Sequence, residues 1–108
     1  MAQDDITLIG KGIRIKGEIT GTASIEVHGT VDGTAGTEGT FRVREGGQVE
    51  GEIAAREVVV DGKVQGLIAA EQKIALNAKS EVQGEIKAKS VSIAEGAYFE
   101  GNVKMPKG

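Results

Sequence analysis

The sequence predicts an all-β protein that winds into a single parallel β-solenoid of about six coils. A five-residue motif, apolar-x-Gly-x-apolar, recurs six times along the 108 residues, at spacings of roughly 15 to 18 residues. A second marker, an apolar-x-apolar pair, recurs in phase with it every 16 or 17 residues. Period-2 alternation and frequent β-branched residues favour strands over helices within each unit. A fixed repeat of strand-like units is typical of a β-solenoid.

The motif copies define one segment of each expected coil. They occupy residues 15–19, 31–35, 49–53, 64–68, 82–86 and 99–103. The apolar pairs define a second segment, at Ile25 and Val27, Phe41 and Val43, Val58 and Val60, Ile74 and Leu76, and Val91 and Ile93. The connection from pair to motif alternates between short and long. The parity of the inward positions slips by one residue between Ala55 and Val58, which predicts a bulge or bent corner there.

Glycine shares the inward parity with the large aliphatic residues, as Gly62 and Gly66 do within Val58–Ala70. A coil that closes in about 17 residues must turn sharply, and at a corner the inward position is narrow. Glycine fits such a position and tolerates a positive φ. We therefore expect glycine to stack on glycine at the corners, with valine and isoleucine stacked on the flat faces.

Composition limits the possible functions. The chain has no cysteine, which excludes disulfides and thiolate metal sites and is compatible with a reducing compartment. Its 13 basic and 16 acidic residues give a net charge of -3, which argues against binding nucleic acid through phosphate contacts. The N-terminal stretch MAQDDITLIG does not resemble a signal peptide, and no stretch approaches the length of a membrane span. These features predict a cytoplasmic protein.

No residue pattern predicts catalysis, and we expect no catalytic, cofactor-binding or metal site and no cofactor. His28 is the only histidine and falls on an outward position at a turn, where a surface role is expected. Glu18, Glu52 and Glu85 recur beside the motif glycine. Paired carboxylates could hydrolyse glycosidic bonds, but Thr34 and Leu67 occupy the equivalent position in other copies, which favours a solvated face.

The ends of the expected solenoid leave little room for caps. We expect residues 1–7 to form a short flexible tail, residues 8–105 the β-helix domain, and residues 106–108 a C-terminal tail, with no capping helices. Uncovered end coils present unpaired strand edges, which are templates for another strand. We therefore expect end-to-end polymerisation through Leu8, Ile13, Ile15 and Ile19 at one end and Phe99, Val103 and Met105 at the other. Val59, Leu67 and Tyr98 are apolar yet outward, and they are candidate lateral or partner contacts.

The serial combination of TLIGKGIRIKGEITG, the VDGKVQGLIAA and VQGEIKA units and SIAEGAYFEGNVKM resembles the bactofilins, a family of polymer-forming bacterial cytoskeletal proteins. The resemblance covers roughly Thr7 to Met105. It implies a right-handed β-helix of triangular cross-section that assembles without nucleotide into non-polar filaments, like ends meeting head to head. It also implies scaffolding of cell-wall synthesis or hydrolysis enzymes and a role in cell shape. Peripheral contact with the inner face of the cytoplasmic membrane is weakly supported, because the tail MAQDD has no hydrophobic anchor. Ala35 departs from the family pattern, so we expect the Gly33–Gly39 stretch to be loose or to protrude.

Two alternatives to a cytoskeletal protein remain at this point. One is a β-helix enzyme of the acyltransferase type, whose coil of three hexapeptides would need about 18 residues and a catalytic histidine. The 16- and 17-residue spacing and the outward His28 disfavour it. The other is a monomeric solenoid that presents one face to a partner protein.

Overall fold

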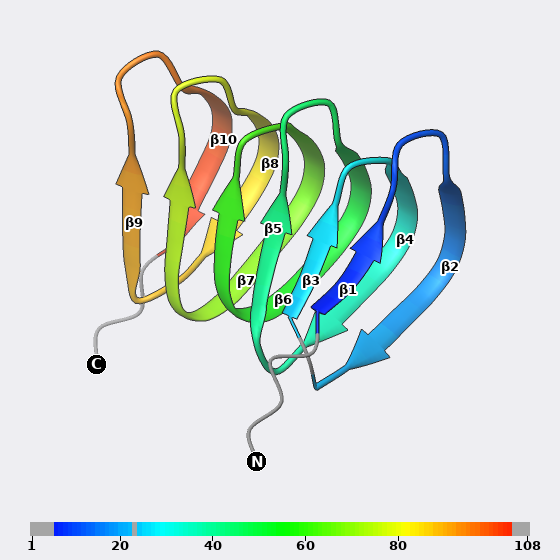
Figure 1. Cartoon of the computed structure of the whole chain (residues 1–108). Helices are drawn as coiled ribbons and strands as arrows, with labels where there is room; N and C mark the ends of the chain where they lie inside the picture. The colour runs from blue at the N-terminus through cyan, green and yellow to red at the C-terminus, as the bar shows by residue number, and fades with distance from the viewer. Residues whose placement is uncertain (1–5, 23, 105–108) are drawn as a thin grey trace.

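The computed structural model describes residues 6–22 and 24–104 and contains ten strands and no helix in that part. Figure 1 shows the strands standing side by side as successive coils, from β1 and β2 at one end to β9 and β10 at the other. The strands are β1 (Ile6–Ile9), β2 (Arg14–Gly21), β3 (Ser24–Val27), β4 (Thr30–Thr37), β5 (Thr40–Val43), β6 (Gln48–Val60), β7 (Lys63–Leu76), β8 (Glu81–Lys87), β9 (Ser90–Ile93) and β10 (Tyr98–Lys104).

Every strand pairing in this part is parallel, and each strand pairs with its counterpart in the next coil. Each of the six coils contains one apolar-pair segment and one motif segment. β6 and β7 are long because each continues from the motif segment of one coil into the pair segment of the next. This arrangement confirms the predicted all-β solenoid of about six coils.

The motif glycines stack in one column along the solenoid, in register from coil to coil: Gly17, Gly33, Gly51, Gly66, Gly84 and Gly101. All six have a positive φ, between 121° and 138°. A Cβ atom on each glycine from Gly33 onward would collide with the carbonyl oxygen of the glycine one coil earlier. These positions need glycine for two reasons, the backbone angle and the close approach of the neighbouring coil.

A second column shows a different reason for small residues. Gly29, Gly47 and Gly62 precede the motif segments, and none of them has a positive φ. A Cβ atom at any of the three would still lie 2.6 Å or less from a backbone oxygen of the preceding coil. The expectation of glycine over glycine is therefore confirmed for the motif column in all six coils, but in the second column it holds only from Gly29 to Gly62, and only the motif column also requires the unusual backbone conformation.

The core is a narrow column of aliphatic side chains. Val64, Ile68, Val82 and Ile86 are completely buried, and Phe41 is the largest of the buried residues. Each inward valine or isoleucine lies against the matching residue of the next coil, as Val64 does against Val82. Burial of one such side chain contributes about 1.5–3 kcal/mol.

The predicted slip in parity lies where the register between β6 and β7 shifts, between Ala55 and Glu57. One residue of β6 there faces two of β7, Glu71 and Gln72. The extra residue lies in β7, so Ala70 and Ile74 are four residues apart where their β6 partners Ala55 and Val58, both buried, are three apart.

Three expectations about the first coils need correction. The Gly33–Gly39 stretch does not protrude, because β4 pairs in register on both sides and Ala35 is completely buried between Ile19 and Ile53. At the start of the chain, Ile9 and not Leu8 takes the inward position. Ile9 is in register with Val27, whereas Leu8 is opposite the outward Glu26. β1 begins at Ile6, inside the range expected to form the N-terminal tail.

Candidate functional site: the two ends of the solenoid

Burial differs sharply between interior coils and end coils. Ile86 and Val103 are in register on neighbouring strands and occupy the same inward position. Ile86 is 0% exposed, whereas Val103, in the last coil, is 38% exposed. The inward side chains of an end coil have a neighbouring coil on one side only. The two ends of the solenoid are therefore its apolar surfaces.

The N-terminal end surface consists of Ile13, Ile15 and Ile19. Ile15 and Ile19 are half-buried and pack on the core, and Ile13 is 49% exposed. Ile13 precedes the motif segment, and the equivalent residue in the second coil is Gly29, which has no room for a Cβ atom. A large side chain is accommodated at this position only because no described coil lies on its outer side.

Leu8 does not belong to that surface. It is 60% exposed on the outer face of β1, opposite Glu26. Two adjacent apolar residues, Leu8 and Ile9, made the parity of the first coil ambiguous in the sequence.

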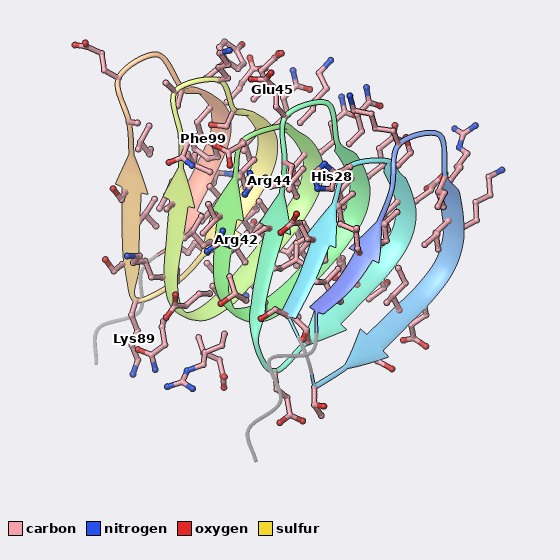
Figure 2. All side chains as sticks on the ribbon, viewed as in Figure 1. His28, Arg42, Arg44, Glu45, Lys89 and Phe99 are labelled. Atoms are coloured by element: carbon pink, nitrogen blue, oxygen red, sulfur yellow. The ribbon has the colours of Figure 1, made fainter. Side chains whose placement is uncertain are left out.

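The C-terminal end surface consists of Phe99, Val103, Val91 and Ile93. Phe99 and Val91 are half-buried, whereas Ile93 is 49% exposed. Figure 2 shows Phe99 near this end of the solenoid. Ile93 was not among the predicted end residues, although it is the last member of the apolar-pair column and the sequence contained that signal. Met105, which was predicted here, lies outside the described residues.

Strand edges accompany both apolar surfaces. β1 pairs only with β3 and β2 only with β4, while β9 pairs only with β7 and β10 only with β8. Within residues 6–22 and 24–104, the outer edges of these four strands have no partner strand. Apolar side chains and unpaired backbone groups occur together at each end, which is the combination that strand addition requires.

The predicted lateral contacts are scattered. Val59 and Leu67 are half-buried, and Tyr98 is 49% exposed. Val59 lies opposite Arg42 and Ala75 on the apolar-pair face, whereas Leu67 lies opposite Glu52 and Glu85 on the motif face. Tyr98 belongs to the last coil, opposite Glu81. The structure therefore does not bring the three together.

His28 lies on the surface in a small polar cluster with arginines (Figure 2). Its Nε2 atom is 2.8 Å from Oε1 of Glu26. This hydrogen bond is the main cause that lowers the pKa of Glu26; desolvation opposes it, and the positive charges of Arg44 and Arg42 add smaller lowering effects. The histidine therefore has a carboxylate partner on the outer face of the second coil.

The recurring glutamates do not form a pair of neighbouring carboxylates. Thr34 lies in register between Glu18 and Glu52, and Leu67 lies between Glu52 and Glu85. Among the described residues, no group of three or more His, Cys, Asp or Glu side chains could hold a metal ion. That part of the chain also holds no helix with the length and hydropathy needed to cross a membrane.

Comparison with known proteins shows which family this chain resembles. A family model described as "Bactofilin: Polymer-forming cytoskeletal" matches residues 7–104. Bactofilin BacO of Myxococcus xanthus (strain DK1622) is 40% identical over 99 residues, which are 92% of this chain and 79% of BacO. BacN of the same organism is 40% identical over 105 residues, 97% of this chain and 93% of BacN. BacP is 35% identical, and the match covers 94% of this chain but 42% of BacP.

Two solved structures share the fold. The solid-state NMR structure of the cytoskeletal bactofilin BacA matches with a TM-score of 0.85 and 31% identity, over 95% of this chain and 98% of BacA. The crystal structure of a mutant of the bactofilin from Thermus thermophilus matches with a TM-score of 0.78 and 28% identity, over 83% of this chain and all of that chain.

Proposed function

Because this chain belongs to the bactofilins, a polymer-forming cytoskeletal family, we propose that it polymerises end to end, without nucleotide, into filaments. One observation carries the proposal. The inward positions of the motif segments are buried in interior coils but partly exposed in both end coils, at Ile15 and Ile19 and at Phe99 and Val103, beside strand edges that have no described partner. Stacking a second copy on either end would bury these side chains and pair these edges.

The energetics favour such a contact. Val103, Ile93 and Ile13 together expose a large share of three branched side chains. Full burial of one such side chain is worth about 1.5–3 kcal/mol. Backbone hydrogen bonds would add a directional component, because parallel and antiparallel strands both pair through the same edge groups. Neither the burial of these side chains nor the pairing of the strand edges requires a bound nucleotide.

We further propose that the filament acts as a cytoplasmic scaffold for enzymes of cell-wall synthesis or hydrolysis and supports cell shape. The family supports a structural role. The absence of cysteine is compatible with a reducing compartment. In this proposal the chain binds a second copy of itself through its ends. The sides of the filament then remain free for other proteins or for peripheral contact with the membrane.

Electron microscopy of the purified protein without added nucleotide tests polymerisation. We expect filaments, and we expect Phe99→Arg to abolish them while leaving a folded solenoid, because a buried charge in the end contact has no partner. Gln65→Arg is the matched control, since Gln65 is exposed on the outer face of an interior coil. Filaments that persist in Phe99→Arg would place the contact elsewhere, and a wild-type chain that stays monomeric at every concentration would refute the proposal.

A further inference from the structure

A groove runs along one outer side of the solenoid, where the motif strands end. Its larger part is a cavity of about 830 Å³ whose lining includes Ala70, Glu71 and the ends of β8 and β10. A shallower hollow of about 470 Å³ adjoins it, shares Ala70 and Glu71, and extends toward Thr20 in the first coil. Glycine, alanine and threonine line most of this hollow. The groove therefore follows the solenoid axis across most of its coils.

Three lysines surround the larger part of the groove: Lys87, Lys89 and Lys104. Figure 2 shows Lys89 at the lower edge of the molecule, below β9. The buried Ala88 lies between Lys87 and Lys89 and forms part of the same lining. In a chain of net charge -3, this end of the groove is a local concentration of positive charge.

The arrangement of these lysines is unfavourable unless an anion is present. Lys87 and Lys104 are directly opposite each other on neighbouring strands, and like charges in that position destabilise a sheet. The Nζ atom of Lys104 lies 3.8 Å from Oε2 of Glu85, which is a single long ion pair. Neither Lys87 nor Lys89 forms an ion pair with a described residue. The positive charge is therefore largely uncompensated within the described part of the chain.

The shape of the groove distinguishes between possible anions. A flat anionic membrane surface would also meet Glu38 and Glu71, which line the same groove and would repel it. An extended peptide can reduce that repulsion, because its acidic residues could lie at the lysines and its small apolar residues beside the glutamates and on the alanines. At about 4.8 Å per coil, five coil spacings correspond to about seven extended residues.

We propose that this groove binds an extended acidic segment of a partner protein, with its carboxylates at Lys87, Lys89 and Lys104. None of the residues that line the groove belongs to either end surface, so a bound segment leaves both end surfaces free. The surface is thus suited to attach other proteins along a filament.

Fluorescence anisotropy with a labelled peptide of four Ala-Glu repeats tests this proposal on the full chain. We expect saturable binding that weakens as salt is raised, and about tenfold or greater loss of affinity in Lys87→Glu/Lys89→Glu. Lys16→Glu/Lys63→Glu is the control, because it makes the same change in net charge at exposed positions of the motif face. We expect the control to bind as the wild type does, and a peptide of four Ala-Gln repeats not to bind.

Several outcomes would overturn the proposal. Absence of binding would do so, as would equal loss of affinity in the groove and control variants, which would indicate net charge alone. Preferential binding to vesicles of anionic phospholipid would assign the lysines to a membrane instead. A second variant, Lys87→Gln/Lys89→Gln, keeps the test valid if charge reversal disturbs the fold, and it should also weaken binding. Lys87→Glu should in addition raise the thermal stability, because it replaces a repulsive cross-strand pair with an attractive one.

Discussion

At the scale of single residues, the two glycine columns distinguish two reasons for glycine: a positive φ angle and a lack of room for a Cβ atom. Gly62 has an ordinary φ and too little room for a side chain, whereas Gly66 has a φ of 122° and is also blocked by the carbonyl of Gly51. Gly17 has nearly the same φ, 121°, but a Cβ atom there would meet nothing within 4 Å. The chain therefore contains a natural pair of positions at which the two requirements can be measured independently.

Alanine substitution at this pair should give different results. Gly17→Ala meets only the unfavourable backbone region and should lower the free energy of unfolding by about 1–3 kcal/mol. Gly66→Ala adds a collision with the backbone of the preceding coil, which cannot be relieved without separating two strands, so we expect it to prevent stable folding. Urea unfolding followed by circular dichroism, in the Ile13→Arg/Phe99→Arg background that keeps the chain monomeric, measures both. Similar losses in the two variants would show that the close approach is unimportant.

The hydrogen bond between His28 and Glu26 predicts a pH dependence. Because the pKa of Glu26 is lowered in the folded chain, its ionised form stabilises the fold. This contribution is complete above the ordinary value of 4.5 and is lost as the pH falls through the lower folded value. The difference in stability between the wild type and Glu26→Gln should therefore be present above about pH 4.5 and shrink below it. His28→Ala removes the hydrogen bond that chiefly lowers the pKa of Glu26, so it should flatten this pH dependence. Denaturation at a series of pH values measures it, and parallel curves of unfolding free energy against pH for all three proteins would contradict the prediction.

At the scale of the coil, stability comes from nearest neighbours. A coil has no core of its own, since its inward side chains are buried only by the coils on either side. The in-register residues Ile86 and Val103 differ chiefly in whether a described coil follows them. The same kind of truncation should therefore have different consequences at the two positions.

We expect Ile86→Ala to lower the free energy of unfolding by about 2–5 kcal/mol. Val103→Ala, at a position that is 38% exposed, should lower it by less than about 1 kcal/mol in the non-polymerising background. In the polymerising chain, the second substitution should instead raise the concentration needed for assembly. Chemical denaturation and sedimentation measure the two effects, and equal destabilisation by both variants would argue against an open C-terminal end.

Much of this coil structure was predictable from the sequence because each repeat constrains the next. The in-phase columns fixed the register of the glycines, and the slip between Ala55 and Val58 located the bulge. The prediction failed where that mutual constraint is weak. No earlier repeat decides between Leu8 and Ile9, and one small residue, Ala35, suggested a loose loop although neighbouring strands hold that segment on both sides. The groove lysines were missed because Lys104 joins Lys87 and Lys89 only once the coils are stacked.

At the scale of the whole molecule, the two ends are chemically different, and this allows the filament polarity to be tested. If like ends meet, each end contact pairs the same surface with itself, and each contact can be disabled separately. Phe99→Arg should then leave dimers joined at the N-terminal ends, and Ile13→Arg should leave dimers joined at the C-terminal ends. The double variant should be monomeric. If unlike ends meet, either single variant gives monomers, a result that light scattering after gel filtration would reveal and that would refute the non-polar arrangement.

In the proposed filament, the half-exposed side chains of the end coils also imply that the subunits would not be equally durable. A subunit in the middle has every coil covered, whereas the terminal coil of a filament can fray with the loss of only one interface. Proteolysis should therefore begin at the filament ends. Its rate should depend on the number of filament ends and not on the total protein concentration. Shearing a sample into shorter pieces without changing its mass should speed its digestion, so that long filaments are, for a cell, the form in which this protein is best preserved.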